Sequence, residues 1–396
     1  MTQALEGIRI IDFSKALAGP YCTMLLADMG AEVIKVEMPG SGDDSRGWGP
    51  PFIEGEAAYF LSINRNKKSI TLNLKDEKAK QLALKIISKA DIVLESNRPG
   101  VMTKLGLDYD TVQKSNPAII YCSISGFGQT GPYSKRPGFD QVIQGYGGIM
   151  GLTGEKGGGP LKVGIAVTDI ATGMFAATGI LTALYHREKT GQGQRVDAAM
   201  LDGQVSWLTY QAGRYLASGK VPERLGSAHP LIVPYQDFEA SDGFINIAAG
   251  NDSLWKKMCA VIGLPKDVAE DPKYATNAQR VENRDAVVKI VSEKIRTRTM
   301  QEWLDLLNTA GVPCGPIYTV DQIFKDPQVL ARDMLVDIDH PKCGRIQVTG
   351  APVKLSETPA QIKSHPPMLG EHNREILQEL GLSVREIEKL KEDRVI

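Results

Sequence analysis

The feature that most constrains the fold is an alternation of short apolar runs with longer helical ones. "IRIIDF" (residues 8–13) and "AEVIKVE" (31–37) have the composition of strands, and "YCTMLLADMG" between them is typical of a helix closed by Gly30. Such a strand–helix–strand unit joins two parallel strands, because a parallel pair needs a long crossover connection. The opening of the chain therefore predicts a parallel sheet covered by helices.

The same pattern recurs through the N-terminal half. Further strands are predicted over 69–74, 91–96 and 118–128, and an amphipathic helix is predicted over 76–90. A sheet built from this half of the chain makes an α/β fold the expected class.

A second region follows, with a strand over 242–250 and helical sequence over 283–311. At 396 residues the chain is longer than a typical single domain, which favours two domains. After residue 312 prolines become frequent, and we predict a long irregular passage before two short helices over 371–380 and 384–391.

Composition excludes several classes of protein. The 46 basic and 47 acidic residues leave a net charge of −1, without the basic excess of a nucleic-acid-binding protein. The five cysteines form no Cys-x-x-Cys pair and the five histidines no His-Glu-x-x-His motif, so we expect no metal site. The first six residues have neither the basic nor the apolar run of a secretory leader, and we expect a cytoplasmic protein.

A nicotinamide-dependent enzyme is one alternative, because Glu37 ends the second strand, where such enzymes place an acid that binds ribose. Their first turn carries Gly-x-Gly-x-x-Gly, which lets the backbone approach the pyrophosphate. Here the turn is "SKALAG", whose single glycine is Gly19. We therefore expect no bound NAD, and we interpret Glu37 as a solvated residue at a strand end.

The stretch "GIAVTDIATG" places one carboxylate, Asp169, before an uncharged segment of small residues over 170–185. Sixteen residues are short for a membrane span, and we expect a buried helix whose neighbours approach its backbone closely, with no membrane contact. Thr168 or Asp169 is a favoured residue type for the N-cap of such a helix. A shielded carboxylate there could equally attack an activated acyl group, and both interpretations of Asp169 stand at this point.

Longer motifs resemble a known family, the class III CoA-transferases. They are "LEGIRIIDFSKALAGPYCTMLLADMGAEVIKVE", "NRNKKSITLNLK", "SISGFGQTGPYSKRPGFDQV", "DIATGMFAATGILTALYHREKTGQGQRVDAAMLD" and "PPMLGEHNREIL". Each is weak alone, but in this order they cover nearly the whole chain and are specific. In that family the aspartate that opens the "DIATG" helix is the nucleophile, which the resemblance assigns to Asp169.

The resemblance implies an enzyme that uses coenzyme A, as acyl-CoA, and a free carboxylic acid as substrates. Asp169 would form a mixed anhydride with the donor acyl group and then an aspartyl-CoA thioester, from which CoA passes to the acceptor. Both intermediates hydrolyse easily, so the site has to exclude water.

Contacts to CoA are implied at positions after the strands of the first half. They are Leu17, Ala18, Met38, Leu72, Asn73, Leu74, Lys75, Ser96, Asn97, Arg98, Lys104, Pro137, Gly138, Phe139 and Asp140. Some relatives have arginine at the position of Met38, so this chain departs from the family at one contact to the nucleotide end. The CoA phosphates need cations, for which the candidates are Arg65, Lys67, Lys68, Lys75, Arg98 and Lys104.

The acid substrate is predicted to lie near Ala249, Gly250 and Asn251, where relatives carry a mobile glycine loop; "AAGND" has one glycine, so a tight turn is the alternative. "GDDSRGWGPPF", "LSINRNKKSI" and "GSAHPLIVPYQDF" look closest to the branch that moves CoA from succinyl-CoA to short-chain dicarboxylates. His229 in the last motif is a candidate to hold the remote carboxylate, with a structural loop histidine as the alternative.

Two other functions are alternatives to CoA transfer. α-Methylacyl-CoA racemase shares the fold, but it has histidine where "RPGFDQV" has Phe139, and a phenyl ring carries no proton. A non-catalytic CoA-binding protein would have no need of Asp169.

The resemblance also implies a shape. A large Rossmann-like domain would span 1–220 and be completed by 330–396, with a smaller α/β domain over 221–329 that includes connecting segments. Two subunits would interlock as a homodimer.

Overall fold

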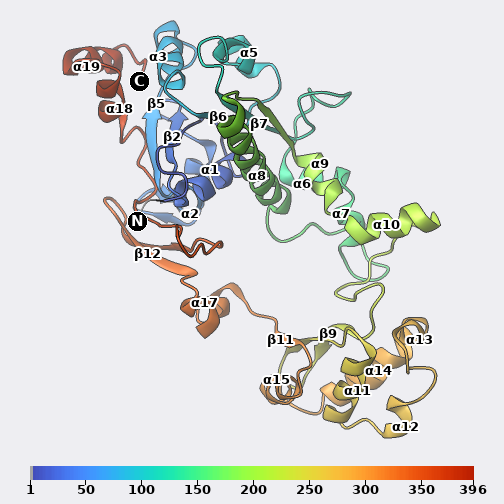
Figure 1. Cartoon of the computed structure of the whole chain (residues 1–396). Coiled ribbons are helices and arrows are strands. Elements are labelled where there is room, and N and C mark those ends of the chain that lie inside the picture. Colours follow the sequence, from blue (N-terminus) through green and yellow to red (C-terminus); the bar gives the residue numbers. More distant parts are fainter. Residues whose placement is uncertain (1–2) are drawn as a thin grey trace. The chain divides into compact units, whose positions relative to one another are not determined.

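The computed structural model describes residues 3–396 (Figure 1). Met1 and Thr2 lie outside the described residues. They are the first two of the six residues in which the sequence shows no features of a secretory leader. Internal contacts divide the chain into two compact units, and each is described by itself.

The two units are discontinuous in sequence. The first comprises the chain up to residue 149, then 162–216 and 327–396, and the second comprises 150–161 and 217–326. These limits lie a few residues from the boundaries at 220 and 330 drawn from the sequence, but residues 150–161, assigned there to the large domain, are part of the second unit.

A six-stranded sheet forms the centre of the first unit, and all its neighbouring strands run parallel (Figure 1). In spatial order the strands are β5 (Lys67–Thr71), β2 (Glu32–Glu37), β1 (Arg9–Asp12), β6 (Ile92–Glu95), β7 (Ile120–Ser125) and β8 (Arg195–Ala199). The sheet confirms the predicted α/β class and its Rossmann-like arrangement.

Helices cover both faces of this sheet, which explains why its strands are apolar on both sides. Ile10 and Ile11 are adjacent in β1, yet each is fully buried in a different apolar core. One core includes residues of α1 (Ala18–Asp28) and α8 (Val167–Thr190). The other includes residues of α3 (Glu77–Ile87), α4 (Val101–Leu105), α5 (Tyr109–Val112), α18 (Asn373–Glu379) and α19 (Val384–Glu392).

The prediction of an irregular passage after residue 312 is wrong in part. That passage contains an antiparallel hairpin of β12 (Leu335–His340) and β13 (Gly344–Thr349). Ile338 and Ile346 face each other in this pair and are buried in a small core of their own. The alternation that places them on one face was obscured by the prolines on either side.

The C-terminal segment closes the edge of the sheet at β5. The backbone N–H of His372 donates to the carbonyl of Ser69 at 2.9 Å. The N–H of Thr71 donates to the side-chain oxygen of Asn373 at 2.8 Å. An edge strand that would otherwise expose unpaired backbone groups is thereby covered.

Short elements complete the first unit: η1 (Asp44–Gly47), β3 (Phe52–Ile53), β4 (Glu56–Ala57), α2 (Ala58–Ile63), α6 (Asp140–Tyr146), α9 (Met200–Ser206) and α17 (Pro327–Ala331). Two helices cross between the units in sequence, α7 (Ile149–Leu152) and α10 (Thr209–Ser218).

The second unit has a three-stranded antiparallel sheet of its own, in the order β11 (Cys314–Pro316), β10 (Phe244–Ala248) and β9 (Tyr235–Glu239). Its helices are α11 (Asp252–Val261), α12 (Lys266–Ala269), α13 (Asn277–Glu282), α14 (Arg284–Ile295), α15 (Met300–Thr309) and α16 (Val320–Ile323). Trp255 and Trp303 fill the core between sheet and helices.

Glu37 is not the solvated residue that the sequence predicts. It is buried at the end of β2, where its carboxylate accepts two hydrogen bonds from the Arg46 guanidinium and one from Ser69. Burial acts to raise the pKa of Glu37, but these bonds and the charge of Lys35 outweigh it and lower that pKa. The sequence feature that could have indicated a buried Glu37 is its partner Arg46, nine residues further along the chain.

Helix α8 packs against α1 at backbone distance. A Cβ atom added at Gly173 would lie 2.6 Å from the carbonyl oxygen of Ala18, so this crossing requires glycine. By length and composition α8, with a mean hydropathy of 1.4, also meets the criteria for a membrane span, as core helices of soluble proteins do. The predicted close approach to a small-residue helix is therefore present, although one face of α8 is exposed.

We predict that Gly173→Ala lowers the free energy of unfolding by about 1–3 kcal/mol, because the added methyl overpacks the α1–α8 crossing. Calorimetric or chemical unfolding measures this change. Gly164→Ala in the loop before α8 is the control, since its added carbon meets nothing within 4 Å. Equal stability of the two variants would contradict the packing argument.

Candidate active site

The strand order of the sheet reverses between β1 and β6. The chain leaves β1 toward β2 on one side and later places β6 on the other. In open α/β sheets, ligands bind in the crevice at the carboxyl ends of the strands where the order reverses. The two loops at this crevice contact each other, because the N–H of Lys15 donates to Ser96 Oγ at 3.0 Å.

The CoA contacts implied by the resemblance lie partly at this crevice, after β1 and β6, and their side chains differ in exposure. Exposed side chains are those of Lys75, Arg98, Lys104, Pro137 and Phe139. The half-buried positions are Met38, Asn73, Leu74, Ser96, Asn97, Gly138 and Asp140. Buried ones are those of Leu17, Ala18 and Leu72.

Two of the cations suggested for the CoA phosphates, Arg65 and Lys67, are buried, and for these two the prediction is wrong. Arg65 is buried in an ion pair with Asp28, 2.7 Å between nitrogen and oxygen. Lys67 is buried beneath the sheet edge, and Lys68 pairs with two glutamates. Lys75, Arg98 and Lys104 remain exposed. Within residues 3–396 no group of three His, Cys, Asp or Glu side chains could hold a metal ion.

Asp169 lies in the first turn of α8 but does not cap it. The N-cap is Ala166, which offers no side-chain bond, so the predicted capping by Thr168 or Asp169 is wrong. Asp169 precedes Gly173 by four residues, and residues so spaced lie on the same helix face about 6 Å apart along the axis. The crossing at Ala18 therefore sets the carboxylate one turn from the loop that follows β1.

Asp140, the first residue of α6, holds the start of α8. Its Oδ1 accepts bonds from the N–H of Thr168 at 2.9 Å and from the hydroxyl of Thr168 at 2.5 Å. Its Oδ2 accepts from the Gln144 amide at 2.7 Å. Asp140 thus takes the capping part that the sequence assigned to Thr168 or Asp169, from 28 residues earlier in the chain.

The carboxylate of Asp169 has no hydrogen-bond donor among residues 3–396, and its side chain is half-buried. Burial, followed by the negative charge of Asp140, raises the pKa of Asp169 to about 7. An ionised carboxylate without donors keeps its lone pairs available for attack on a carbonyl carbon.

Two aromatic residues near this carboxylate were missed by sequence reasoning. The rings of Trp48 and Tyr59 pack edge to face, 5.0 Å between centroids. Burial raises the pKa of Tyr59 to about 12, and the charges of Asp169, Asp43 and Asp140 add to that rise, so the phenol stays protonated. More than 100 residues separate Tyr59 from Asp169, and no spacing in the sequence points from one to the other.

Comparison with known proteins decides the family. The sequence profile of CoA-transferase family III matches residues 5–373. The chain belongs to this family. It is a CoA-transferase, and coenzyme A is a substrate of such enzymes.

Named relatives match over nearly the whole chain. Succinyl-CoA:glutarate CoA-transferase of Mus musculus is 44% identical over 95% of this chain and 86% of its own. Succinate–glutarate CoA-transferase of Agrobacterium fabrum is 43% identical over 95% of both chains. The crystal structure of a CaiB/BaiF family protein from Brucella suis superposes with a TM-score of 0.86 at 43% identity, covering 96% of this chain and all of that one.

The residues predicted to meet the acid substrate lie in the second unit. Ala249 is fully buried, and the side chain of Asn251 caps α11 by accepting from the N–H of Leu254 at 2.9 Å. Together with exposed Gly250 they form the short link between β10 and α11. His229 Nδ1 accepts from the N–H of Leu231 at 3.1 Å, which fits a loop role. Their contact with substrate stays a prediction.

We predict that kcat/KM falls about tenfold per pH unit below about pH 7, because the nucleophilic role that the resemblance implies for Asp169 requires its ionised form. Asp140→Asn removes the neighbouring negative charge and lowers the pKa of Asp169, so the acidic limb moves to lower pH. Glu188→Gln removes a charge from the far end of α8, about 28 Å away, and leaves the limb in place. An acidic limb that is the same in all three proteins would contradict this electrostatic account.

Proposed function

We propose that this protein transfers CoA from succinyl-CoA to a short-chain dicarboxylic acid, with Asp169 as the covalent nucleophile. The observation that carries the proposal is the half-buried carboxylate of Asp169, which no donor within residues 3–396 bonds, in the first turn of a helix packed on the β1–α1 loop.

The reaction proceeds by four acyl transfers. A carboxylate oxygen of Asp169 attacks the thioester carbon of the donor, the C–S bond breaks, and CoA thiolate leaves a mixed anhydride behind. The thiolate attacks the Asp169 carbonyl carbon of this anhydride and releases succinate, which gives aspartyl-CoA. The acceptor carboxylate displaces the thiolate from aspartyl-CoA and forms a second anhydride. The thiolate then attacks the acceptor's acyl carbon, which forms the product and frees Asp169.

The chain's own side chains have distinct parts in this scheme. Exposed Lys75, Arg98 and Lys104 are the cations for the phosphates of CoA. The backbone of Leu17 and Ala18, at the start of α1, meets the cofactor at the switch-point crevice. Protonated Tyr59 offers a hydroxyl donor near the carboxylate, which suits the developing oxyanions.

Support for a dicarboxylate acceptor comes from the acids in the names of the relatives. Besides the glutarate enzymes, they include a succinyl-CoA:mesaconate CoA-transferase of Haloarcula hispanica, 41% identical over 96% of this chain and 97% of its own. His229 is proposed to hold the remote carboxylate of the acid.

We predict that Asp169→Ala lowers CoA transfer from succinyl-CoA to glutarate more than about 10³-fold, because no covalent intermediate can form. Product acyl-CoA is measured by mass spectrometry, with calorimetric binding of CoA as the check that the variant is folded. Wild-type protein mixed with succinyl-CoA and trapped with hydroxylamine should be modified at Asp169. Transfer at the parental rate by the folded variant would refute the mechanism.

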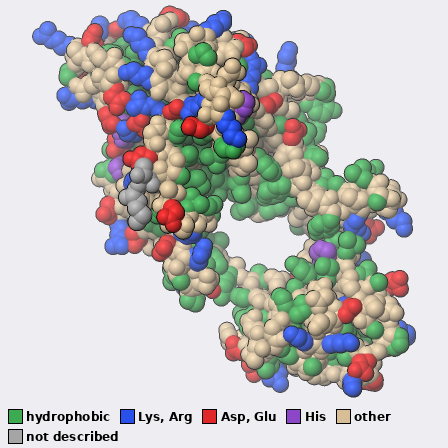
Figure 2. Space-filling model, viewed as in Figure 1, with side chains coloured by type: hydrophobic (Ala, Val, Ile, Leu, Met, Phe, Trp, Pro, Cys, Tyr) green, Lys and Arg blue, Asp and Glu red, His purple; other side chains and the backbone are tan. Residues whose placement is uncertain are grey.

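A homodimer is proposed from the exposed apolar surface of the first unit. On α8 the side chains of Met174 and Tyr185 are 50% and 64% exposed, and Leu216 on α10 is 79% exposed. Figure 2 shows further green apolar side chains over the region of α8 and α9. Apolar patches of this extent usually mark an interface.

We predict that the protein sediments as a dimer at micromolar concentration. Met174→Arg should shift it toward monomer, because a charge at the interface is desolvated without a partner. Val384→Arg on α19 is the matched control, because Val384 is exposed to a similar degree, 44%, on the opposite face of the sheet. A monomeric wild-type protein would refute the proposal.

A further inference from the structure

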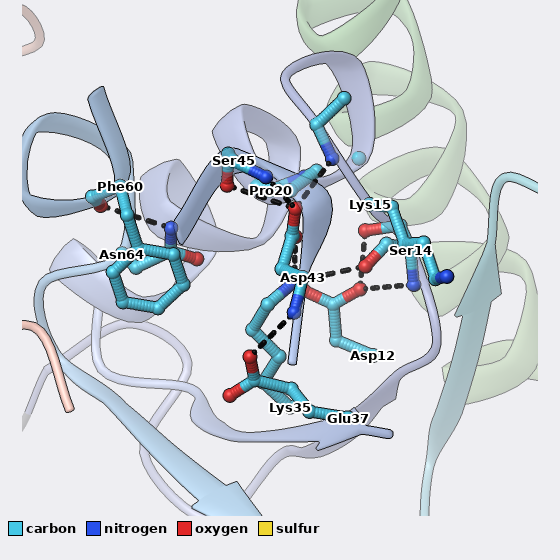
Figure 3. Close-up of polar contacts among 12 residues, drawn as sticks. Asp12, Ser14, Lys15, Pro20, Lys35, Glu37, Asp43, Ser45, Phe60 and Asn64 are labelled. Carbon is cyan, nitrogen blue, oxygen red and sulfur yellow. Dashed lines mark hydrogen bonds and ion pairs between the residues drawn. The ribbon is translucent and has the colours of Figure 1, made fainter. Parts of the chain in front are cut away.

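Four charged side chains lie buried under the loop between β1 and α1, and Figure 3 labels Asp12, Lys35 and Asp43 among them. Asp12 and Lys35 come from adjacent strands, Lys67 from β5 and Asp43 from the segment before η1, and each is at most 2% exposed. Burial lowers the pKa of Lys67 to about 7, while the carboxylates of Asp12 and Asp43 act against that. Burying charged groups costs free energy, so such groups usually have a structural or functional role. Their hydrogen bonds indicate what that role is.

Four hydrogen bonds of these side chains end on the loop of residues 14–18. Asp12 accepts from the N–H and the hydroxyl of Ser14, and Lys35 Nζ donates to the carbonyl of Ser14 at 2.8 Å. Asp43 Oδ1 accepts from the N–H of Ala16 at 3.1 Å. Ala16 has φ of 64°, a left-handed conformation that an alanine keeps only when its surroundings impose it.

Asp43 is the member that joins the loop to the rest of the site. Its Oδ2 lies 2.7 Å from Lys35 Nζ. Burial acts to raise the pKa of Asp43, but the charge of Lys35 outweighs burial and lowers that pKa to about 2. Its Oδ1 also accepts from the N–H and the hydroxyl of Ser45, at 2.9 and 2.8 Å, which starts the turn η1. That turn leads directly to Trp48, whose ring packs on Tyr59.

We propose that Asp43, fixed by Lys35, is a positioning residue that presets the 14–18 loop for CoA and ties it to the Trp48–Tyr59 pair. This inference rests on the proposed function, in which the backbone of Leu17 and Ala18 meets CoA. Without the bond from Asp43, the left-handed Ala16 relaxes to ordinary backbone conformations, and only a fraction of molecules presents the loop correctly. Apparent affinity for CoA falls by that fraction.

The test compares Asp43 with an equally buried ion pair elsewhere in the first unit. Asp28 pairs with Arg65, with side chains 2% and 1% exposed, at the far end of α1 from the loop. Binding of free CoA is measured by calorimetry, thermal unfolding by circular dichroism, and kcat and KM with succinyl-CoA and glutarate. Asp43→Asn and Asp28→Asn should both lower the unfolding temperature. Only Asp43→Asn should raise the Kd for CoA and the KM for succinyl-CoA, by about tenfold, with kcat changed less than about threefold.

A second variant separates positioning from folding. Lys35→Met combined with Asp43→Leu removes one charge of each sign, so Asp12 and Lys67 still balance, and apolar replacement of a buried pair is often neutral for stability. This double variant should unfold at a temperature near that of wild type and still bind CoA about tenfold more weakly.

Each result decides between the claims. Wild-type affinity for CoA in the folded double variant, or an equal loss of affinity in Asp28→Asn, would overturn the positioning role. Wild-type protein that binds CoA but transfers none to any acid would refute the proposed function alone. Wild-type protein that does not bind CoA would refute both.

Discussion

The packing of α8 on α1 at Gly173 is the contact on which the site depends. Because a glycine meets the carbonyl of Ala18, the two helices approach as closely as backbones can, and the first turn of α8 is fixed beside the first turn of α1. The sheet beneath them supplies the second constraint, since its strand order reverses next to β1. The proposed nucleophile on one helix and the loop proposed to bind CoA at the start of the other are thus held by one crossing.

The first unit treats its buried charges in two opposite ways. Asp12, Lys35, Asp43 and Lys67 are matched in number and sign and bonded to backbone, so they rigidify the loop that they support. Asp169 has no donor within residues 3–396 and faces another carboxylate in Asp140. Pairing stabilises an ionised group and makes it less reactive. The unpaired carboxylate of Asp169 is higher in free energy, which favours the attack proposed for it.

Sequence alone predicted the α/β class, the main strands and the family, whereas the nucleophilic role of Asp169 stays a prediction. Those successes came from local patterns, such as "IRIIDF", or from a long ordered series of motifs. What it missed depends on contacts between residues that are separated in the sequence. Arg46 donates to Glu37, and Arg65 forms an ion pair with Asp28. The N–H of Thr168 donates to Asp140. A lysine or arginine exposed for a phosphate and one committed to an internal carboxylate look identical in a sequence. Only the fold tells them apart.

Helix α8 shows why the expectation of a wholly buried helix was half right. Its small residues, including Gly173, Ala176 and Ala183, face α1 and the sheet, while Met174 and Tyr185 face outward. Periodicity could not separate these faces, because both are apolar. The chemistry proposed for Asp169 needs water excluded from an anhydride, yet within one chain the carboxylate is only half-buried. A second copy seated on the outward face of α8 would supply that missing cover, which links the proposed dimer to the proposed reaction through one surface.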